Sequence, residues 1–183
     1  MKEFTKVEVL KISYKPSARS YFILLKDLEG KNIISLSIGS FEAQIIALAL
    51  ESIDQVRPMT HDLICSLFYE TGFNLKSVQI TEFENGVLKA ILDLELRKVE
   101  RIKIDSRPSD AIIIALKKNA PILVSRKLME NPNLQKITLS KSINKNHEKI
   151  FLKTLKSKLE SAVKNERYRV AAKLRDKIKE IEG

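Results

Sequence analysis

The chain has few of the residues on which several classes of protein depend. Among its 183 residues there is one cysteine, Cys65, which excludes an internal disulfide and a zinc site built from cysteines. Glycine and proline number five each and 44% of the residues are hydrophobic, a composition typical of a folded chain. The longest apolar runs, such as residues 111–116, are too short to cross a bilayer. The first residues lead directly into a strand-like pattern, so we expect no signal peptide and a cytoplasmic location.

Common site motifs are missing as well. No P-loop, dinucleotide-binding fingerprint, Ser-His-Asp set or zinc-ligand spacing is present. Cys65 lies in an apolar segment, where we expect a small core residue. His147 lies in a polar segment, where we expect it to be solvated.

Positive charge is concentrated near the C-terminus. The net charge is +10, and residues 141–183 carry +7 of it. A basic segment can bind phosphate backbones or the acidic surface of a partner protein, and charge alone does not distinguish the two. Lysines recur every fourth residue from 141 to 153, which on a continuous helix would form one basic stripe. A solvated linker is the alternative, because residues 140–146 are poor helix formers.

Residues 1–140 alternate between strand patterns and helix patterns. Strands are predicted at 7–12, 21–25, 33–38, 78–83, 87–96, 101–105 and 122–124, with a hairpin turn at Asn85-Gly86. Helices are predicted at 41–52, at 61–69 and from Pro108 until residues 119–121 stop the helix. Strands joined by hairpins, with helices inserted between them, predict an α+β fold with a mixed or antiparallel sheet.

Two further regions follow this domain. Residues 136–148 are polar and rich in helix breakers, so we predict a linker between a domain at 1–135 and a second unit at 149–183. Leucine, isoleucine and alanine recur at heptad spacing in that unit, which predicts an α-helical hairpin. About thirty residues bury too little apolar surface to fold well alone. The apolar seam must therefore be covered by its own domain, by another copy or by a partner protein.

Three predicted helices begin with short polar motifs. Residues 107–110 (Arg-Pro-Ser-Asp) open a helix whose body is apolar on all sides, as expected of a helix buried in a core. Residues 57–62 (Arg-Pro-Met-Thr-His-Asp) and 39–42 (Gly-Ser-Phe-Glu) open the other two. Hydroxyl side chains are expected to cap these helices, namely Ser40, Thr60 and either Ser106 or Ser109.

Together these motifs resemble the bifunctional nuclease domain family. The resemblance rests on residues 38–44, 57–63 and 107–111, the last running on to 120–122, and it covers about residues 5–135. It implies an α+β domain that is often oligomeric, as a dimer or larger homo-oligomer, with a nuclease activity on RNA and DNA attributed to some members.

The C-terminal segment carries a second, independent resemblance. Residues 155–182 are similar to the UVR motif, the helical hairpin through which the B and C subunits of the bacterial excision nuclease associate. The motif also occurs in some chaperone and kinase-regulator proteins. Arg169 stands where an acidic residue is common. The two resemblances together indicate a bacterial protein whose hairpin, residues 149–183, associates with a protein partner.

Hydrolysis of a phosphodiester needs an activated water, a group that stabilises the charge growing on phosphorus and help for the leaving oxygen. Divalent metals held by carboxylates commonly supply all three. We therefore predict a site where the three helix starts meet, with Mg²⁺ or Mn²⁺ as the cofactor and nucleic acid as the substrate. The candidate catalytic residues are Glu42, His61, Asp62 and Asp110, with Glu42, Asp62 and Asp110 also as metal ligands and with Arg57 and Arg107 as phosphate-binding residues.

A structural interpretation of the same residues stays open. An acid in the first turn of a helix is favoured by the helix dipole alone, and the arginines can pin helices to strands through salt bridges. The alternative function is a non-catalytic binding or adaptor protein whose hairpin docks a repair or proteolysis partner. Asp93 and Glu95 form another acidic pair, on one face of a predicted strand. There we expect a solvated sheet face and no metal site.

Overall fold

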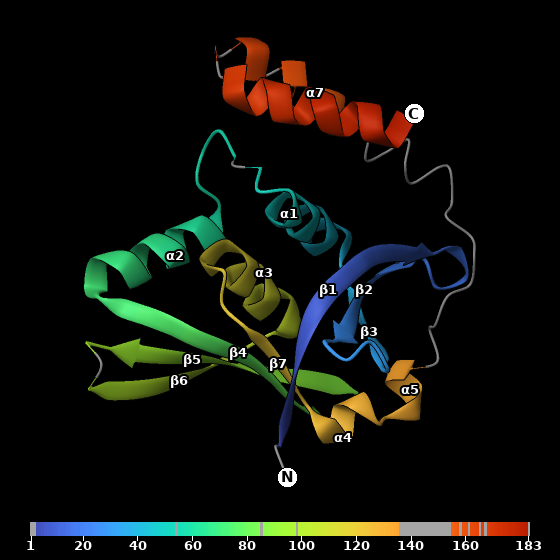
Figure 1. Ribbon diagram of the computed structural model, residues 1–183, viewed down its shortest axis with the longest axis vertical. Helices are drawn as coiled ribbons and strands as arrows, with labels where there is room; N and C mark the ends of the chain where they lie inside the picture. The colour runs from blue at the N-terminus through green and yellow to red at the C-terminus, as the bar shows by residue number, and fades with distance from the viewer. Residues whose placement is uncertain are drawn as a thin grey trace.

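A mixed seven-stranded sheet with three helices on one side forms the first part of the chain (Figure 1). The computed structural model describes residues 3–53, 55–84, 86–97 and 99–135, and then 155–157, 159–160, 162–164, 166 and 168–182. The strands are β1 (Phe4–Lys15), β2 (Ser20–Asp27), β3 (Ile33–Ile38), β4 (Phe73–Glu84), β5 (Val87–Leu96), β6 (Glu100–Ser106) and β7 (Ile122–Ser125). The helical elements are the 3-10 turn η1 (Pro16–Ala18), α1 (Ser40–Leu50), α2 (Thr60–Thr71), α3 (Pro108–Lys118), α4 (Arg126–Met129), α5 (Pro132–Gln135) and α7 (Tyr168–Glu182).

The strand order is β3-β2-β1-β7-β4-β5-β6. All neighbours are antiparallel except β4 and β7, which run parallel, so the predicted α+β fold with a mixed sheet is confirmed. Parallel neighbours need a crossover connection, and α3 provides it between β6 and β7. The shortest strand, β7, therefore lies at the centre of the sheet, and α3 crosses over β4 and β5 to reach it.

The predicted hairpin turn is confirmed by the register of β4 and β5. Glu84 lies opposite Val87, which leaves two residues for the turn. Gly86 has a φ of 82°, a left-handed conformation that glycine adopts without a steric penalty. A turn of this kind fixes which residues of β5 face the helices.

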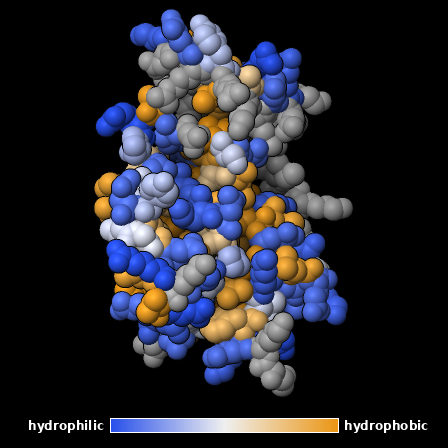
Figure 2. Space-filling model, turned by 60° about the vertical axis from the view of Figure 1, so that its left-hand side comes forward, coloured by the Kyte–Doolittle hydropathy of each residue, from blue (hydrophilic) through white to orange (hydrophobic). Residues whose placement is uncertain are grey.

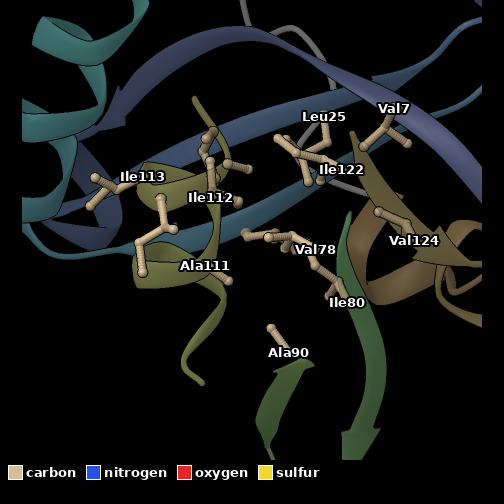
Figure 3. Close-up of a cluster of buried hydrophobic side chains, with 14 of the residues drawn as sticks. Val7, Leu25, Val78, Ile80, Ala90, Ala111, Ile112, Ile113, Ile122 and Val124 are labelled. Atoms are coloured by element: carbon tan, nitrogen blue, oxygen red, sulfur yellow. The ribbon is translucent and has the colours of Figure 1, made fainter. Parts of the chain in front are cut away.

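The main core lies between α3 and the middle strands (Figure 3). Ile112 and Ile113 of α3 are fully buried, as are Val78 of β4 and Val124 of β7. Residues 111–115 are buried on every side of the helix, as the apolar run predicts. Cys65 packs against this core, in agreement with its expected role as a small core residue.

Unlike α3, whose residues 111–115 are buried on every side, α2 has an outer face that is exposed to solvent. His61 and Phe68 are the buried residues of α2, whereas Leu63, Leu67 and Tyr69 are exposed. Figure 2 looks onto the side of the molecule where α2 lies and shows apolar patches among hydrophilic residues. Exposed apolar side chains of this kind are common on protein surfaces when they are scattered.

The predicted hydroxyl caps of the three helices are wrong. The N-cap residues are Gly39, Met59 and Arg107, each with an extended backbone, so none of the hydroxyl residues predicted as caps is an N-cap residue. Ser40 and Thr60 are the first residues of their helices, and the Ser106 hydroxyl donates to the carbonyl of Arg107. The acids take the N3 position instead, since Glu42, Asp62 and Asp110 each follow the N-cap by three residues. That position favours negative charge because it lies within the positive end of the helix dipole.

The C-terminal hairpin packs onto its own domain. Leu155, Ala162, Ala171, Leu174 and Ile178 are buried in one cluster with Leu48 and Ile53. Leu48 belongs to α1 and Ile53 follows it, and Figure 1 shows α7 lying over α1. The apolar seam of the hairpin is therefore covered by the chain's own domain, the first of the three alternatives given by the sequence.

Several sequence predictions concern residues outside this description. The linker 136–148, with His147, and the lysines from 141 to 153 lie outside the described residues. Among the described helices, none has the length and apolar character needed to span a membrane.

Candidate active site

Four polar side chains meet where the first turns of α1, α2 and α3 come together. They are Glu42 of α1, His61 of α2, and Arg107 and Asp110 at the start of α3. Because α1 and α2 both pack against α3, residues that are 49 and 65 positions apart in the sequence come into contact, namely His61 with Asp110 and Glu42 with Arg107. We call these four residues the helix-start cluster.

Arg107 links the two acids of the helix-start cluster. Its Nε donates to Asp110 Oδ2 at 2.7 Å and its Nη2 donates to Asp110 Oδ1 at 3.0 Å, a two-pronged contact that fixes the guanidinium plane. Its Nη1 lies 3.6 Å from Glu42 Oε1. The Arg107 side chain is 68% exposed, whereas those of Asp110 and Glu42 are 24% and 20% exposed. The cluster therefore presents a cationic group to solvent with two carboxylates behind it.

Asp110 is held in its ionised form by its neighbours. Burial alone would raise the pKa of Asp110, but hydrogen bonds from Arg107 and His61 outweigh it and lower the pKa below its usual value. The same Asp110 contact raises the pKa of Arg107. With both acids ionised and Arg107 protonated, these three side chains sum to one net negative charge. A divalent cation bound there would reverse the sign and favour a phosphate group.

His61 is the most buried member of the cluster. Its Nε2 lies 3.1 Å from Asp110 Oδ1, and the side chain is 10% exposed. The tautomer with the proton on Nε2 makes this contact a hydrogen bond to the carboxylate. Its Nδ1 is buried and has no hydrogen-bond partner among the described residues. Both ring nitrogens thus point away from solvent, so the geometry suits a residue that positions Asp110.

Gly39 shapes the cluster from the backbone, a role that the sequence analysis missed. A Cβ atom placed on Gly39 would overlap Glu42 Oε2, since the carboxylate folds back over the N-cap. Glycine therefore gives the Glu42 carboxylate room at this position, and a larger residue would displace it; the φ of −72° is one that other residues also adopt. The sequence signal was present in the Gly39-Ser40-Phe41-Glu42 motif, but only the fold shows which residue the glycine accommodates.

Asp62 lies apart from the contacts of the cluster. Its Oδ1 lies 2.6 Å from Lys117 Nζ in the last turn of α3, and its Oδ2 accepts a hydrogen bond from the Met59 N–H at 2.8 Å. Burial alone would raise the pKa of Asp62. The hydrogen bonds from Lys117 and from the Met59 N–H outweigh this effect, so the pKa is lower than usual and the carboxylate stays ionised. Lys117 was not considered from the sequence, and its place in the last helical turn was the available signal. A cavity of about 640 Å³ opens beside this ion pair, between α2 and the end of α3.

Arg57 lies outside the helix-start cluster, and the predicted metal ligands do not all gather at one place. Arg57 is exposed in the loop before α2, and no ion pair found among the described residues involves it. The described residues contain no group of three or more His, Cys, Asp and Glu side chains placed to hold a metal ion. Glu42 and Asp110 are the two predicted ligands that the structure brings together on one partner, Arg107.

Comparisons with known proteins identify the family. The model of the bifunctional nuclease domain matches residues 23–136, which contain the helix-start cluster, and the model of the UvrB/uvrC motif matches residues 149–183. The first match covers more than half of the chain, so the chain belongs to the bifunctional nuclease domain family. The two resemblances seen in the sequence are thereby confirmed.

Individual relatives agree with this assignment. An uncharacterized protein of Mycobacterium tuberculosis is 33% identical over 128 residues, which cover 70% of this chain and 76% of that protein. Bifunctional nuclease 1 of Oryza sativa subsp. japonica is 31% identical over 125 residues. That match covers 66% of this chain and only 38% of the rice protein.

Proposed function

We propose that this chain is a nuclease that hydrolyses phosphodiester bonds in DNA, RNA or both at the helix-start cluster. The observation that carries the proposal is the exposed guanidinium of Arg107 held between the carboxylates of Glu42 and Asp110. A planar guanidinium fits two phosphate oxygens, and fixed acids beside it are the ligands that hard divalent cations prefer. The relationship to proteins named as bifunctional nucleases supports the same reaction class.

Metal binding is the step that the local charge favours. Mg²⁺ is commonly held by one or two carboxylates together with water and substrate phosphates, so Glu42 and Asp110 suffice as protein ligands. A metal held by these two carboxylates would supply Lewis acidity toward the phosphoryl group and would make a water molecule easier to deprotonate as the nucleophile. Arg107 then binds a non-bridging phosphate oxygen and stabilises the charge that develops on it.

The other predicted residues support this arrangement. His61 orients Asp110 through Nε2 and keeps that carboxylate turned toward Arg107. Asp62 pairs with Lys117 at the other end of α3, so its role is to join the two helices away from the helix-start cluster. Arg57, exposed in the loop before α2, supplies a second positive charge for the nucleic-acid backbone.

The C-terminal hairpin is proposed to bind a protein partner. The match to the UvrB/uvrC motif supports this role. Because the apolar seam already packs on Leu48 and Ile53, the partner would contact the outer face of the hairpin, where Val163 and Tyr168 are exposed.

One observation favours the non-catalytic alternative. Arg107, Asp110 and His61 also satisfy one another as a structural network, and a binding or adaptor protein would need nothing more from them. The two functions differ in what Glu42 must do. Its contact with Arg107 at 3.6 Å is long, and a purely structural cluster would lose little without its charge.

The test is cleavage of single-stranded DNA, duplex DNA and RNA by the full chain in Mg²⁺, in Mn²⁺ and in EDTA. We expect cleavage that needs the metal and that falls about 100-fold or more in Glu42→Gln, a change that keeps the size of the side chain. Ser40→Ala, two residues away on the same exposed helix start, is the control and should retain activity. Equal cleavage by wild type and Glu42→Gln, or no cleavage of any substrate, would contradict the proposal.

A further inference from the structure

The strand β6 is an open edge of the sheet. Within the described residues it pairs with β5 alone, and it is the last strand in the order β3-β2-β1-β7-β4-β5-β6. The opposite edge strand, β3, is in contact with α4 and α5, and its buried Ser35 hydroxyl donates to the Leu134 carbonyl of α5 at 2.8 Å. An open edge presents a row of N–H and C=O groups that another strand can satisfy.

On the face of the sheet that carries the helices, β6 has two isoleucines that are only partly covered. Ile102 and Ile104 lie opposite Leu94 and Leu92 of β5, which are core residues. The helix α2 packs on β4, and α3 packs on β4 and β5, but neither gives the same cover to β6. Ile104 is consequently 43% exposed, although its cross-strand neighbour is buried.

The sequence of β6 is complementary to itself in one antiparallel register. If β6 pairs with β6 of a second copy about a two-fold axis at Lys103, Ile102 lies opposite Ile104 of the partner subunit. In the same register Arg101 lies opposite Asp105 of the partner subunit. Symmetry makes each of these pairs twice, so the interface holds two apolar contacts and two opposite-charge contacts.

In this register Lys103 of one subunit faces Lys103 of the partner subunit, and Asp93 of β5 lies next to each of these lysines. Asp93 of β5 lies directly opposite Lys103 in the sheet, so the two side chains share a face. Asp93 is only 6% exposed, which makes the expected solvated face wrong at this residue, and its Oδ1 has no hydrogen-bond partner among the described residues. Its Oδ2 lies 3.9 Å from Arg101 Nη1. A Lys103 ammonium turned toward Asp93 satisfies this oxygen and moves away from Lys103 of the partner subunit.

We propose that two copies of this chain associate through their β6 strands, in the antiparallel register centred on Lys103, to form one continuous sheet. The occupant of the open edge is a second copy because the charges and isoleucines of β6 complement themselves in that register. The strand also leads directly into the helix-start cluster, since β6 ends at Ser106 and α3 starts at Pro108.

Pairing in this register brings each subunit to the other's cluster. Glu100 of the partner subunit lies opposite Ser106, so the partner's β5–β6 turn, whose Val99 is 90% exposed, lies beside Arg107. The two Arg107 residues are then about 27 Å apart along the strands, at 3.4 Å per residue. The contribution of this turn to substrate binding rests on the proposed function, whereas the pairing of the strands does not.

A pair of cysteine variants of the full chain tests the register. In Lys103→Cys the two new cysteines face each other across the axis, with Cα atoms about 4.5–5.5 Å apart, which suits a disulfide. In Arg101→Cys, the matched control, the same positive charge is lost but the two cysteines lie about 14 Å apart along the strands. Cys65 is present in both variants, so it cannot account for a difference between them.

Under mild oxidation we expect most of Lys103→Cys to become a covalent dimer and Arg101→Cys to stay uncrosslinked. Light scattering of the wild type should give twice the 20.9 kDa of one chain. A monomeric wild type, no crosslink in Lys103→Cys, or equal crosslinking in both variants would overturn the proposal. A monomer that still cleaves nucleic acid would overturn the strand pairing and leave the proposed function standing. A crosslinked dimer that cleaves no nucleic acid would support the pairing and contradict the proposed function.

Discussion

Replacing Asp110 by alanine is expected to destabilise the fold by a predictable amount. The change leaves His61 Nε2 buried without an acceptor, and Nδ1 already has no partner among the described residues. A buried donor left without a partner costs about 1–3 kcal/mol. Loss of the acid from the first turn of α3 adds about 0.3–1 kcal/mol, and loss of the contact with the exposed Arg107 adds at most about 1 kcal/mol. Together these losses should lower the free energy of unfolding by about 1–5 kcal/mol.

Replacing Asp110 by asparagine should cost much less. The amide oxygen can still accept the hydrogen bond from His61, so only the losses that depend on the negative charge remain, about 1 kcal/mol. Urea unfolding of wild type and both variants, followed by circular dichroism at pH 7, measures the difference. A cost below about 0.5 kcal/mol for Asp110→Ala would refute the buried contact. Equal costs for the two variants would show that the charge, and not the hydrogen bond to His61, stabilises this region.

Three other predictions follow from particular contacts. Gly39→Ala should change the free energy of unfolding by less than about 1 kcal/mol, because its φ suits alanine, yet lower cleavage by displacing the Glu42 carboxylate; urea unfolding and initial rates measure the two effects. Asp27 is buried, which raises its pKa, but hydrogen bonds from residues 31–32 lower the pKa below its usual value. Asp27→Asn should therefore be less stable than wild type at pH 7, with a difference that shrinks as the pH falls below about 4, measured by thermal melts across pH. Leu174→Ala should weaken the docking of the hairpin by about 2–5 kcal/mol and raise amide exchange in α7 at least about tenfold while the sheet stays protected, as hydrogen-exchange mass spectrometry would show.

The elements of the fold could be predicted from local patterns, whereas their order in the sheet could not. Alternation along 87–96 and the apolar run at 111–116 depend on neighbouring residues, so strand and helix were predictable. The central place of β7 depends on the crossover through α3, which brings a four-residue strand between β1 and β4. Nothing within residues 122–124 carries that information.

The candidate site was predictable to the same extent. The motifs at the helix starts identified Glu42, His61, Arg107 and Asp110, because charged residues at the ends of apolar helices are conspicuous in a sequence. The sequence could not separate Asp62 from them, since it occupies the same N3 position as the other two acids. Its partner Lys117 lies 55 residues away and becomes a neighbour only when α2 packs on α3.

The most direct test of the central claim compares nucleic-acid cleavage by Asp110→Asn and Asp62→Asn in the full chain. Both variants lose one carboxylate charge at the N3 position of a helix, but only Asp110 belongs to the helix-start cluster. With Mg²⁺ or Mn²⁺ and after thermal melts show that both variants are folded, we expect Asp110→Asn to lose about 100-fold or more in initial rate. Asp62→Asn should stay within a few-fold of wild type. Equal rates in the two folded variants would contradict a catalytic site at the start of α3.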